Sequence, residues 1–263
     1  RRRWARSSGG AGLEAVLGVC ERGAVRVDLV RSGPHALMAG TTGAGKSELL
    51  TSWLLQLALA LPPQRLSFVL VDYKGGAAFG ALTDLPHTAG LLTDLDPALT
   101  TRALTSLEAE VGRRERLLAE YGAKDLSCLE AGAAPARLVI AVDEFAALAS
   151  AHPEVLEGLM RVAAQGRSLG IHLILATQRP AGAVSPAIRA NTAVRVCLRV
   201  LDAADSVDVV GCDEAARLGP RPGRLVVRGV EGAEHVALQA PWCGDGARVA
   251  GVVAELGAAA AGL

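Results

Sequence analysis

The sequence predicts an α/β protein whose mostly parallel sheet is covered by helices on both faces. Three observations indicate this class. Short apolar segments alternate with helical patterns along the chain. Two of these segments, Leu66–Asp72 and Leu138–Asp143, are almost wholly apolar and end in aspartate, which is typical of strands buried on both faces. A glycine-rich turn at residues 40–47 also joins an apolar strand to a helix, as in phosphate-binding α/β proteins.

The remaining elements follow from local patterns. The pattern Val25, Val27 and Leu29 predicts a β lead-in within 13–31. A long helix is expected to be capped by Asp96 and ended by Gly122, and Gly170 is expected to end another. The expected helices cover Ser47–Leu61, 97–122 and 153–169, and the expected strands cover His35–Ala39, Ile171–Ala176, 193–201, 223–228 and 234–239. The Ala/Gly-rich tail is expected to form a last helix that frays.

The composition excludes several other classes of protein. The chain has 263 residues, of which 51% are hydrophobic and 21% charged, so it is long enough for a large core and unlike a disordered or coiled-coil chain. Its 27 basic and 27 acidic side chains balance, which argues against a globally basic nucleic-acid binder. The five cysteines form no CxxC pair, and no apolar run would span a bilayer. We expect an intracellular globular domain, cut from a longer protein because the chain opens without Met.

The turn at 40–47 fits the phosphate-loop pattern GxxxxGK[ST] completely. Glycines let the backbone curl so that its N–H groups point at a phosphate, and the following helix adds its dipole. Lys46 is expected to reach the β- and γ-phosphates of ATP, and Ser47 to bind Mg²⁺. The predicted nucleotide-binding residues are Gly40, Thr41, Thr42, Gly43, Ala44, Gly45, Lys46, Ser47 and Glu48.

Two later strand ends carry candidate catalytic residues. Asp143 ends a strand and is expected to hold Mg²⁺ through water, while the adjoining Glu144 is expected to activate the attacking water. Gln178 follows the next strand and is a candidate to contact the γ-phosphate or that water. A third polar strand end, Asp72–Lys74, is either part of the same crevice or a simple turn.

Arginines are candidates for completing a neighbour's active site. Arg189, Arg195 and Arg199 lie in one segment, and Arg167 competes for the same role. In ring ATPases an arginine offered across the interface neutralises charge on the γ-phosphate. Within one subunit, the same residues are equally compatible with ordinary surface charge.

Together these motifs resemble the FtsK/SpoIIIE-type motor ATPases. The segments GTTGAGKSE, VDEF, RSLGIHLILATQRP and RANTAVRVCLRV follow that family's order, and the match covers 13–243. Within the family the chain is similar to the ATPase domains of type VII secretion motors, the EccC/EssC proteins. That finer resemblance rests on VLVDYKGGAAFGALTDLPHTAGLLTDLD, EVGRRERLL, VLDAADS and GPRPGRLVVRGVEGAEHVALQAPW.

The resemblance implies a RecA-like P-loop NTPase of the additional-strand class, in which the strand before Gln178 lies between those before Gly40 and Glu144. It divides the chain into an N-terminal extension with the β lead-in (1–30), the ATPase domain (31–243) and the tail (244–263). It implies assembly with sister domains or identical subunits in a ring, expected to be hexameric, with Arg195 as the preferred arginine finger. Val207 stands where many members have arginine, which puts the turnover rate in question.

Three functions are compatible with this resemblance. The first is an ATP-hydrolysing motor domain for protein export by a type VII-like system, with an exported protein as partner. It would be the cytoplasmic domain of a membrane-anchored bacterial, actinobacterial-type protein. The second is a double-stranded DNA translocase, which would need a basic stripe that the charge balance does not favour. The third is a regulatory module that holds ATP without hydrolysing it and docks a substrate peptide.

Overall fold

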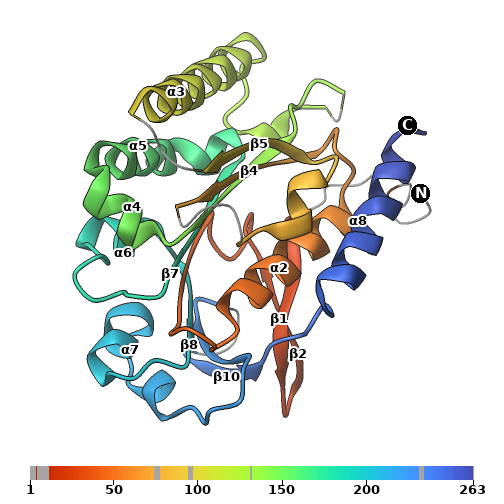
Figure 1. Ribbon diagram of the computed structural model, residues 1–263. Helices are drawn as coiled ribbons and strands as arrows, with labels where there is room; N and C mark the ends of the chain where they lie inside the picture. Colours follow the sequence, from red (N-terminus) through yellow and green to blue (C-terminus); the bar gives the residue numbers. More distant parts are fainter. Residues whose placement is uncertain are drawn as a thin grey trace.

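The computed structural model describes residues 4, 12–73, 78–93, 97–130, 132–230 and 234–262, with only the backbone described over 97–100. In this part of the chain ten strands form one mixed sheet in the order β2-β1-β10-β9-β8-β3-β7-β6-β4-β5. Figure 1 shows the sheet between two layers of helices. The expected α/β architecture is therefore confirmed.

Six neighbouring strands form the parallel part of the sheet. In sheet order they are β8 (Val194–Leu198), β3 (His35–Ala39), β7 (Ile171–Thr177), β6 (Arg137–Asp143), β4 (Leu66–Asp72) and β5 (Thr88–Thr93). β7 lies between β3 and β6, as the resemblance implied. Because parallel strands end at one edge of the sheet, the residues that follow β3, β6 and β7 lie close together.

Four antiparallel strands extend this sheet on the β8 side. They are β9 (Arg224–Arg228), β10 (Val236–Gln239), β1 (Glu14–Cys20) and β2 (Gly23–Asp28). The predicted β lead-in is thus a hairpin that joins the same sheet as the phosphate loop. After β10 the chain continues into α8 (Gly246–Ala260), the last helix in Figure 1.

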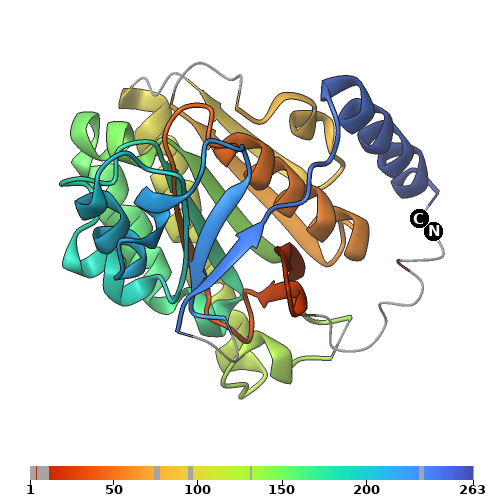
Figure 2. The ribbon, with the colours of Figure 1, turned by 90° about the horizontal axis from the view of Figure 1, so that it is seen from below.

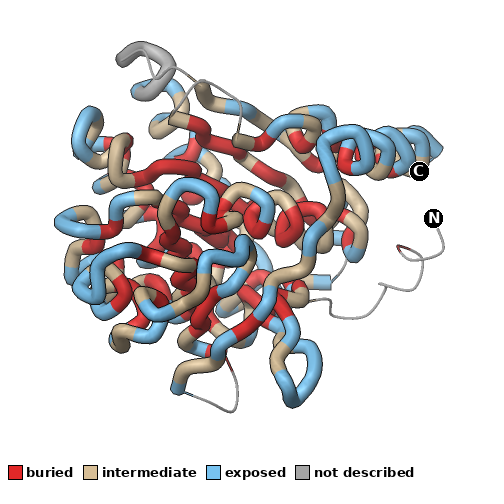
Figure 3. Tube along the Cα trace, turned by 60° about the horizontal axis from the view of Figure 1, so that its bottom comes forward, coloured by how far each residue is buried: buried red, intermediate tan, exposed pale blue. Residues whose placement is uncertain are grey.

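Each face of the sheet has its own apolar core. On one face α2 (Lys46–Ala60), the short 3₁₀ helix η1 (Gly80–Asp84) and α8 pack on the strands, and Val249, Val253 and Leu256 attach α8. The other face carries α3 (Pro97–Glu120), α4 (Phe145–Ala151), α5 (Pro153–Leu169), α6 (Pro186–Asn191) and α7 (Ala203–Val210). Figure 2 shows these layers from below, and the buried chain runs through the centre in Figure 3.

Most predicted boundaries are confirmed to within a few residues. β3 and β4 match their predicted ranges, and α5 ends at Gly170, whose φ of 64° suits glycine. The expected cap Asp96 lies outside the described residues. The sequence analysis missed β5, α4, α6 and α7. These elements have six to eight residues each, too few to show a clear period.

Two short 3₁₀ helices complete the description. η2 (Leu126–Cys128) is capped by Asp125, whose carboxylate accepts a hydrogen bond from the Ser127 N–H at 2.8 Å. η3 (Glu214–Arg217) follows α7. Over the described residues, no helix combines the length and apolarity that crossing a membrane requires.

Candidate nucleotide-binding site

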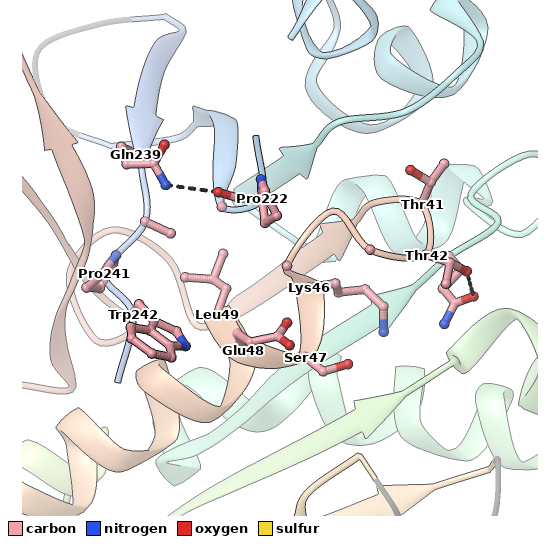
Figure 4. Close-up of a pocket in the computed structure, with 15 residues that line it drawn as sticks. Thr41, Thr42, Lys46, Ser47, Glu48, Leu49, Pro222, Gln239, Pro241 and Trp242 are labelled. Carbon is pink, nitrogen blue, oxygen red and sulfur yellow. Dashed lines mark hydrogen bonds between the residues drawn. The ribbon is translucent and has the colours of Figure 1, made fainter. Parts of the chain in front are cut away.

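A pocket of about 420 Å³ lies at the carboxyl ends of the parallel strands (Figure 4). The phosphate loop and the start of α2 form one wall, and residues 222–223 and 239–242 form the opposite one. Gln178 extends the first wall from the end of β7. The predicted nucleotide-binding residues among the lining are Thr41, Thr42, Gly43, Gly45, Lys46, Ser47 and Glu48.

The phosphate loop depends on glycine at two positions. Gly43 and Gly45 have φ angles of 77° and 95°, in the left-handed region that glycine adopts most readily. A Cβ on Gly45 would also lie 2.8 Å from the Gly223 backbone nitrogen. Gly223 donates a hydrogen bond to the Ala44 carbonyl at 2.8 Å, which ties the loop to the opposite wall. The sequence motif therefore folds into the close turn that its glycines predict.

Lys46 and Asp143 form a buried ion pair beneath this loop. The lysine is 4% exposed and the aspartate 6% exposed. Lys46 is the first residue of α2, while Asp143 ends β6, so the pair connects the start of this helix to a strand end of the sheet. A buried charge is costly unless it has a partner, and here the carboxylate provides one.

Glu144 is buried beside this pair and adopts an unusual backbone conformation. Its φ of 58° is the only positive value of a described non-glycine residue. Its Oε1 accepts hydrogen bonds from the Thr177 hydroxyl at 3.1 Å and the Gln178 N–H at 3.2 Å. The side chain is 3% exposed and is not part of the pocket wall. In this conformation the carboxylate is turned toward β7.

Gln178 connects the phosphate loop to Glu144. Its side-chain Oε1 accepts a hydrogen bond from the Thr42 hydroxyl at 2.9 Å, while its backbone N–H donates to Glu144. Within the described chain no partner is found for its Nε2 group. Gln178 therefore offers amide donors to the pocket.

The opposite wall contains residues that the sequence analysis did not single out: Pro222, Gln239, Pro241 and Trp242. Trp242 is 74% exposed although it is a large aromatic residue. The Gln239 Nε2 donates to the Pro222 carbonyl at 3.1 Å and so links the two segments. An aromatic ring and two prolines are suited to pack against a flat purine base. The sequence around Trp242 contains no motif that would place this side chain in the nucleotide pocket.

Arg195 lies away from this pocket, on the sheet face that carries α6 and α7. Its Nε donates to the Thr192 carbonyl at 3.0 Å and its guanidinium to the Arg189 carbonyl at 2.7 Å. Burial, together with Arg228 and Arg189, lowers its pKa. Arg189 itself pairs with Asp208 at 3.5 Å. Arg195 does not take part in its own chain's pocket.

Two remaining candidates from the sequence are the strand end at Asp72–Lys74 and Arg199. Asp72 lies beside Asp143 in the register of β4 and β6, and its Oδ2 accepts a hydrogen bond from Ala78 N–H at 2.8 Å. Lys74 lies outside the described residues. The Arg199 carbonyl accepts hydrogen bonds from the Thr41 N–H and hydroxyl at 3.1 and 3.0 Å, so its backbone holds the phosphate loop.

The loop, the strand order and the acidic strand end define a P-loop NTPase of the additional-strand class. The FtsK/SpoIIIE family model matches residues 4–139 and 130–182, and the chain belongs to that family. Family membership implies nucleotide binding. It confirms the family resemblance that the motifs indicated.

Known relatives narrow the comparison. The chain is 40% identical over 219 residues to the type VII secretion system protein EssC of Staphylococcus aureus, which covers 81% of this chain and 15% of that protein. It is 38% identical over 195 residues to the ESX secretion system protein YukB of Bacillus subtilis, which covers 71% of this chain and 13% of that protein. The chain thus spans a small part of these relatives' length.

A solved structure agrees with this relationship. The cytoplasmic domain of the Thermomonospora curvata type VII secretion ATPase EccC superposes with a TM-score of 0.83 at 32% identity, covering 93% of this chain and 31% of that one. The conjugation coupling protein TcpA, bound to ATPγS, superposes with a TM-score of 0.79 at 26% identity, covering 95% and 72% of the two chains. The fold and the finer EccC/EssC resemblance are both confirmed.

Proposed function

We propose that this chain is an ATP-binding and ATP-hydrolysing motor domain of a type VII-like protein export machine. The buried group of Lys46, Asp143 and Glu144 beneath a complete phosphate loop carries the ATPase part of the proposal. The 40% identity to EssC supports the export part. A lysine, a metal-binding carboxylate and a second carboxylate are the groups that ATP hydrolysis requires at this position.

ATP binding uses the pocket that the loop and residues 239–242 enclose. The phosphates lie over the loop and the N-terminus of α2, and the base packs between Trp242 and Pro222. Lys46 leaves Asp143 for the β- and γ-phosphates. The oxygens of Ser47 and Asp143 are hard donors that fit Mg²⁺, which neutralises phosphate charge when it is bound.

Hydrolysis then depends on Glu144 turning toward the pocket. The carboxylate takes a proton from water while the water oxygen bonds to the γ-phosphorus. The bond from that phosphorus to the β–γ bridging oxygen breaks, and ADP leaves. The Gln178 Nε2 donates to the γ-phosphate while its Oε1 keeps the hydrogen bond from Thr42. A shift of the Gln178 backbone toward the phosphate would then loosen the N–H that holds Glu144 in the turned-away position.

The assembly is a further part of the proposal. A solved structure contains ATPases 2 and 3 of Thermomonospora curvata EccC in complex with a signal sequence peptide. It is 25% identical to this chain and superposes with a TM-score of 0.81. We expect this chain to work with sister ATPase domains or identical subunits in a hexameric ring, on an exported protein. The ring would belong to the cytoplasmic part of a membrane-anchored bacterial protein.

Arg195 is proposed to act on a neighbour's γ-phosphate, which is compatible with its position away from its own pocket. It would first have to release the Thr192 and Arg189 carbonyls. Mixing Arg195→Ala with Glu144→Gln subunits tests this role, because some interfaces then pair an intact glutamate with an intact arginine. Partial recovery of ATPase activity in a co-assembled mixture supports the role. Absence of recovery in that mixture contradicts the role of Arg195 and makes Arg189 or Arg167 the next candidate for it.

The decisive experiment measures ATP binding by calorimetry and ATP hydrolysis in the assembled protein. Lys46→Ala should lose affinity, whereas Glu144→Gln should bind ATP like the parent and lose hydrolysis. An unchanged rate in Glu144→Gln contradicts the mechanism, and absence of hydrolysis by the parent assembly favours the regulatory module. Stimulation by linear DNA that falls at higher salt would favour the DNA translocase.

A further inference from the structure

A second cavity, of about 410 Å³, lies at the amino ends of β6 and β7, opposite the edge where the nucleotide pocket lies. Residues of the β2–β3 turn, of η2 and of the C-terminal half of α5 form its walls. Its polar lining is rich in donors and positive charge: Lys124, Ser127, Arg137, Gln165, Arg167 and Ser168. Nothing in the proposed ATPase cycle uses this cavity.

Arg137, the first residue of β6, carries a charge that lacks a direct partner. Its guanidinium makes no hydrogen bond or ion pair with any residue that the structure describes. Burial lowers its pKa, although Asp28 and Asp125 act in the opposite direction. The nearby Arg114 shows the usual alternative, because it pairs with Glu110 and donates to the Leu169 carbonyl at 2.7 Å. Arg137 is only partly buried, so its donors remain available to solvent or to a ligand in the cavity.

His172 lines the same cavity and also has an unused polar atom. It is 1% exposed, and its Nδ1 donates to the Pro34 carbonyl at 3.1 Å. Its Nε2 is buried without any hydrogen-bond partner in the described part of the chain. Burial and the charge of Arg137 lower the pKa of His172 to about 3, so the ring is neutral and Nε2 is an acceptor. A buried acceptor without a donor is unfavourable, so a hydrogen-bond donor placed beside it would be stabilising.

The acidic residues near the cavity already have donors of their own. Asp125 accepts hydrogen bonds from the backbone and hydroxyl of Ser127. Asp28 accepts them from the N–H groups of Leu13 and Val30 at 2.9 and 2.8 Å. The lining itself contains three cations and one carboxylate, Lys124, Arg137 and Arg167 against Asp125. Its charge is therefore positive on balance.

We propose that this cavity binds a phosphate group, carried by a small molecule or a lipid headgroup. The Arg137 guanidinium fork matches two phosphate oxygens, and Lys124 and Arg167 add charge. Gln165 and Ser168 supply further polar contacts. Inorganic hydrogen phosphate keeps one O–H at neutral pH, which would donate to the His172 Nε2, whereas an ionised phosphate ester has no such proton and would be bound by the cations and the polar side chains. The proposal does not depend on the ATPase function, because the two sites share no residue.

The test titrates inorganic phosphate into the ¹⁵N-labelled chain while a non-hydrolysable ATP analogue with Mg²⁺ fills the nucleotide pocket. Saturable amide shifts are expected at residues 126–127, 167–168 and 172. Arg137→Gln should weaken phosphate binding about 10-fold or more, and Arg167→Gln should weaken it less. Arg161→Gln is the matched control. It removes an equal charge from α5 outside the cavity, where Arg161 pairs with Glu108 at 3.1 Å.

Two further arms identify the source of the phosphate. Glycerol 3-phosphate represents small phosphate esters, and vesicles with anionic phospholipids represent a membrane surface. Binding of free phosphate or the ester that depends on Arg137 supports a small ligand, and Arg137-dependent sedimentation with vesicles alone supports a lipid headgroup. Parent-like phosphate affinity in folded Arg137→Gln, shifts confined to residues 40–48, or no binding in any arm overturns the proposal.

Discussion

The two ends of the sheet carry positive charge in different states: Lys46 is buried and Arg137 is only partly buried. At the carboxyl end, the Lys46 ammonium is 4% exposed and has the Asp143 carboxylate as a partner. At the amino end, Arg137 has no such partner among the described residues, and the His172 Nε2 beside it is also unsatisfied. A buried polar atom without a partner is unfavourable, so a ligand that pairs with it would be stabilising. Lys46 must therefore leave Asp143 to bind a ligand at the carboxyl end. At the amino end, Arg137 can bind a ligand without first breaking an ion pair.

The largest expected effect removes the chemistry at the carboxyl end. Glu144→Gln keeps the size of the side chain but loses the carboxylate that takes the proton, so ATP hydrolysis should fall about 10²–10⁴-fold. Calorimetry should give parent-like affinity for Mg-ATP. Phosphate binding at the amino end should be unchanged, and a parallel loss there would contradict the independence of the two sites.

A smaller effect concerns the base. Trp242→Ala should weaken ATP affinity about 10-fold, because stacking of an aromatic ring on a base is lost. Its 74% exposure in this structure makes damage to the core improbable as a cause. Trp242→Phe serves as the control, since it keeps an aromatic face and should retain most of the affinity in the same calorimetric titration. Equal affinity in all three proteins would remove Trp242 from the site.

The hydrogen bond from Thr177 to Glu144 can be removed without changing a charged residue. Thr177→Val keeps the shape of a fully buried side chain but removes the hydroxyl that bonds Glu144 Oε1. We expect ATP turnover without transport substrate to rise about fivefold, the equivalent of one lost hydrogen bond. Thr177→Ser restores the donor and should behave like the parent. A lower rate in Thr177→Val would show that the hydroxyl positions Glu144 for reaction instead.

The last effect concerns stability, not turnover or affinity, and tests the amino end through pH. The pKa of His172 is about 3 in the folded chain against about 6.5 when unfolded, so below pH 6.5 the unfolded state binds the extra proton. The free energy of unfolding should therefore fall as the pH decreases from 7 to 5. His172 alone accounts for about 2 kcal/mol of this loss.

His172→Gln should show a correspondingly shallower decline in urea denaturation at pH 7 and pH 5. His35 and His87, whose pKa values burial also lowers, remain in both proteins and provide the common background. An identical decline in parent and variant would contradict a buried neutral His172.

The strands and long helices could be predicted because their patterns are local. The phosphate loop was recognisable because the constraint is local too, with Gly43 and Gly45 at positive φ beside a lysine at the start of a helix. The ends of β6 and β7 indicated Asp143, Glu144 and Gln178 for the same reason. The short elements β5, α4, α6 and α7 escaped prediction because neighbouring packing, more than periodicity, stabilises them.

By itself the sequence determined the class of fold, the family and the candidate residues of the nucleotide site, because strand–loop–helix motifs carry those constraints over a few residues. Only the tertiary structure decided which residues meet from distant segments. Trp242 faces a loop about 200 positions earlier because β10 joins the sheet that β3 also belongs to. The Thr177–Glu144 hydrogen bond and the cavity around Arg137 likewise depend on the order and register of the strands. The pattern of side chains along the sequence does not specify that order or register.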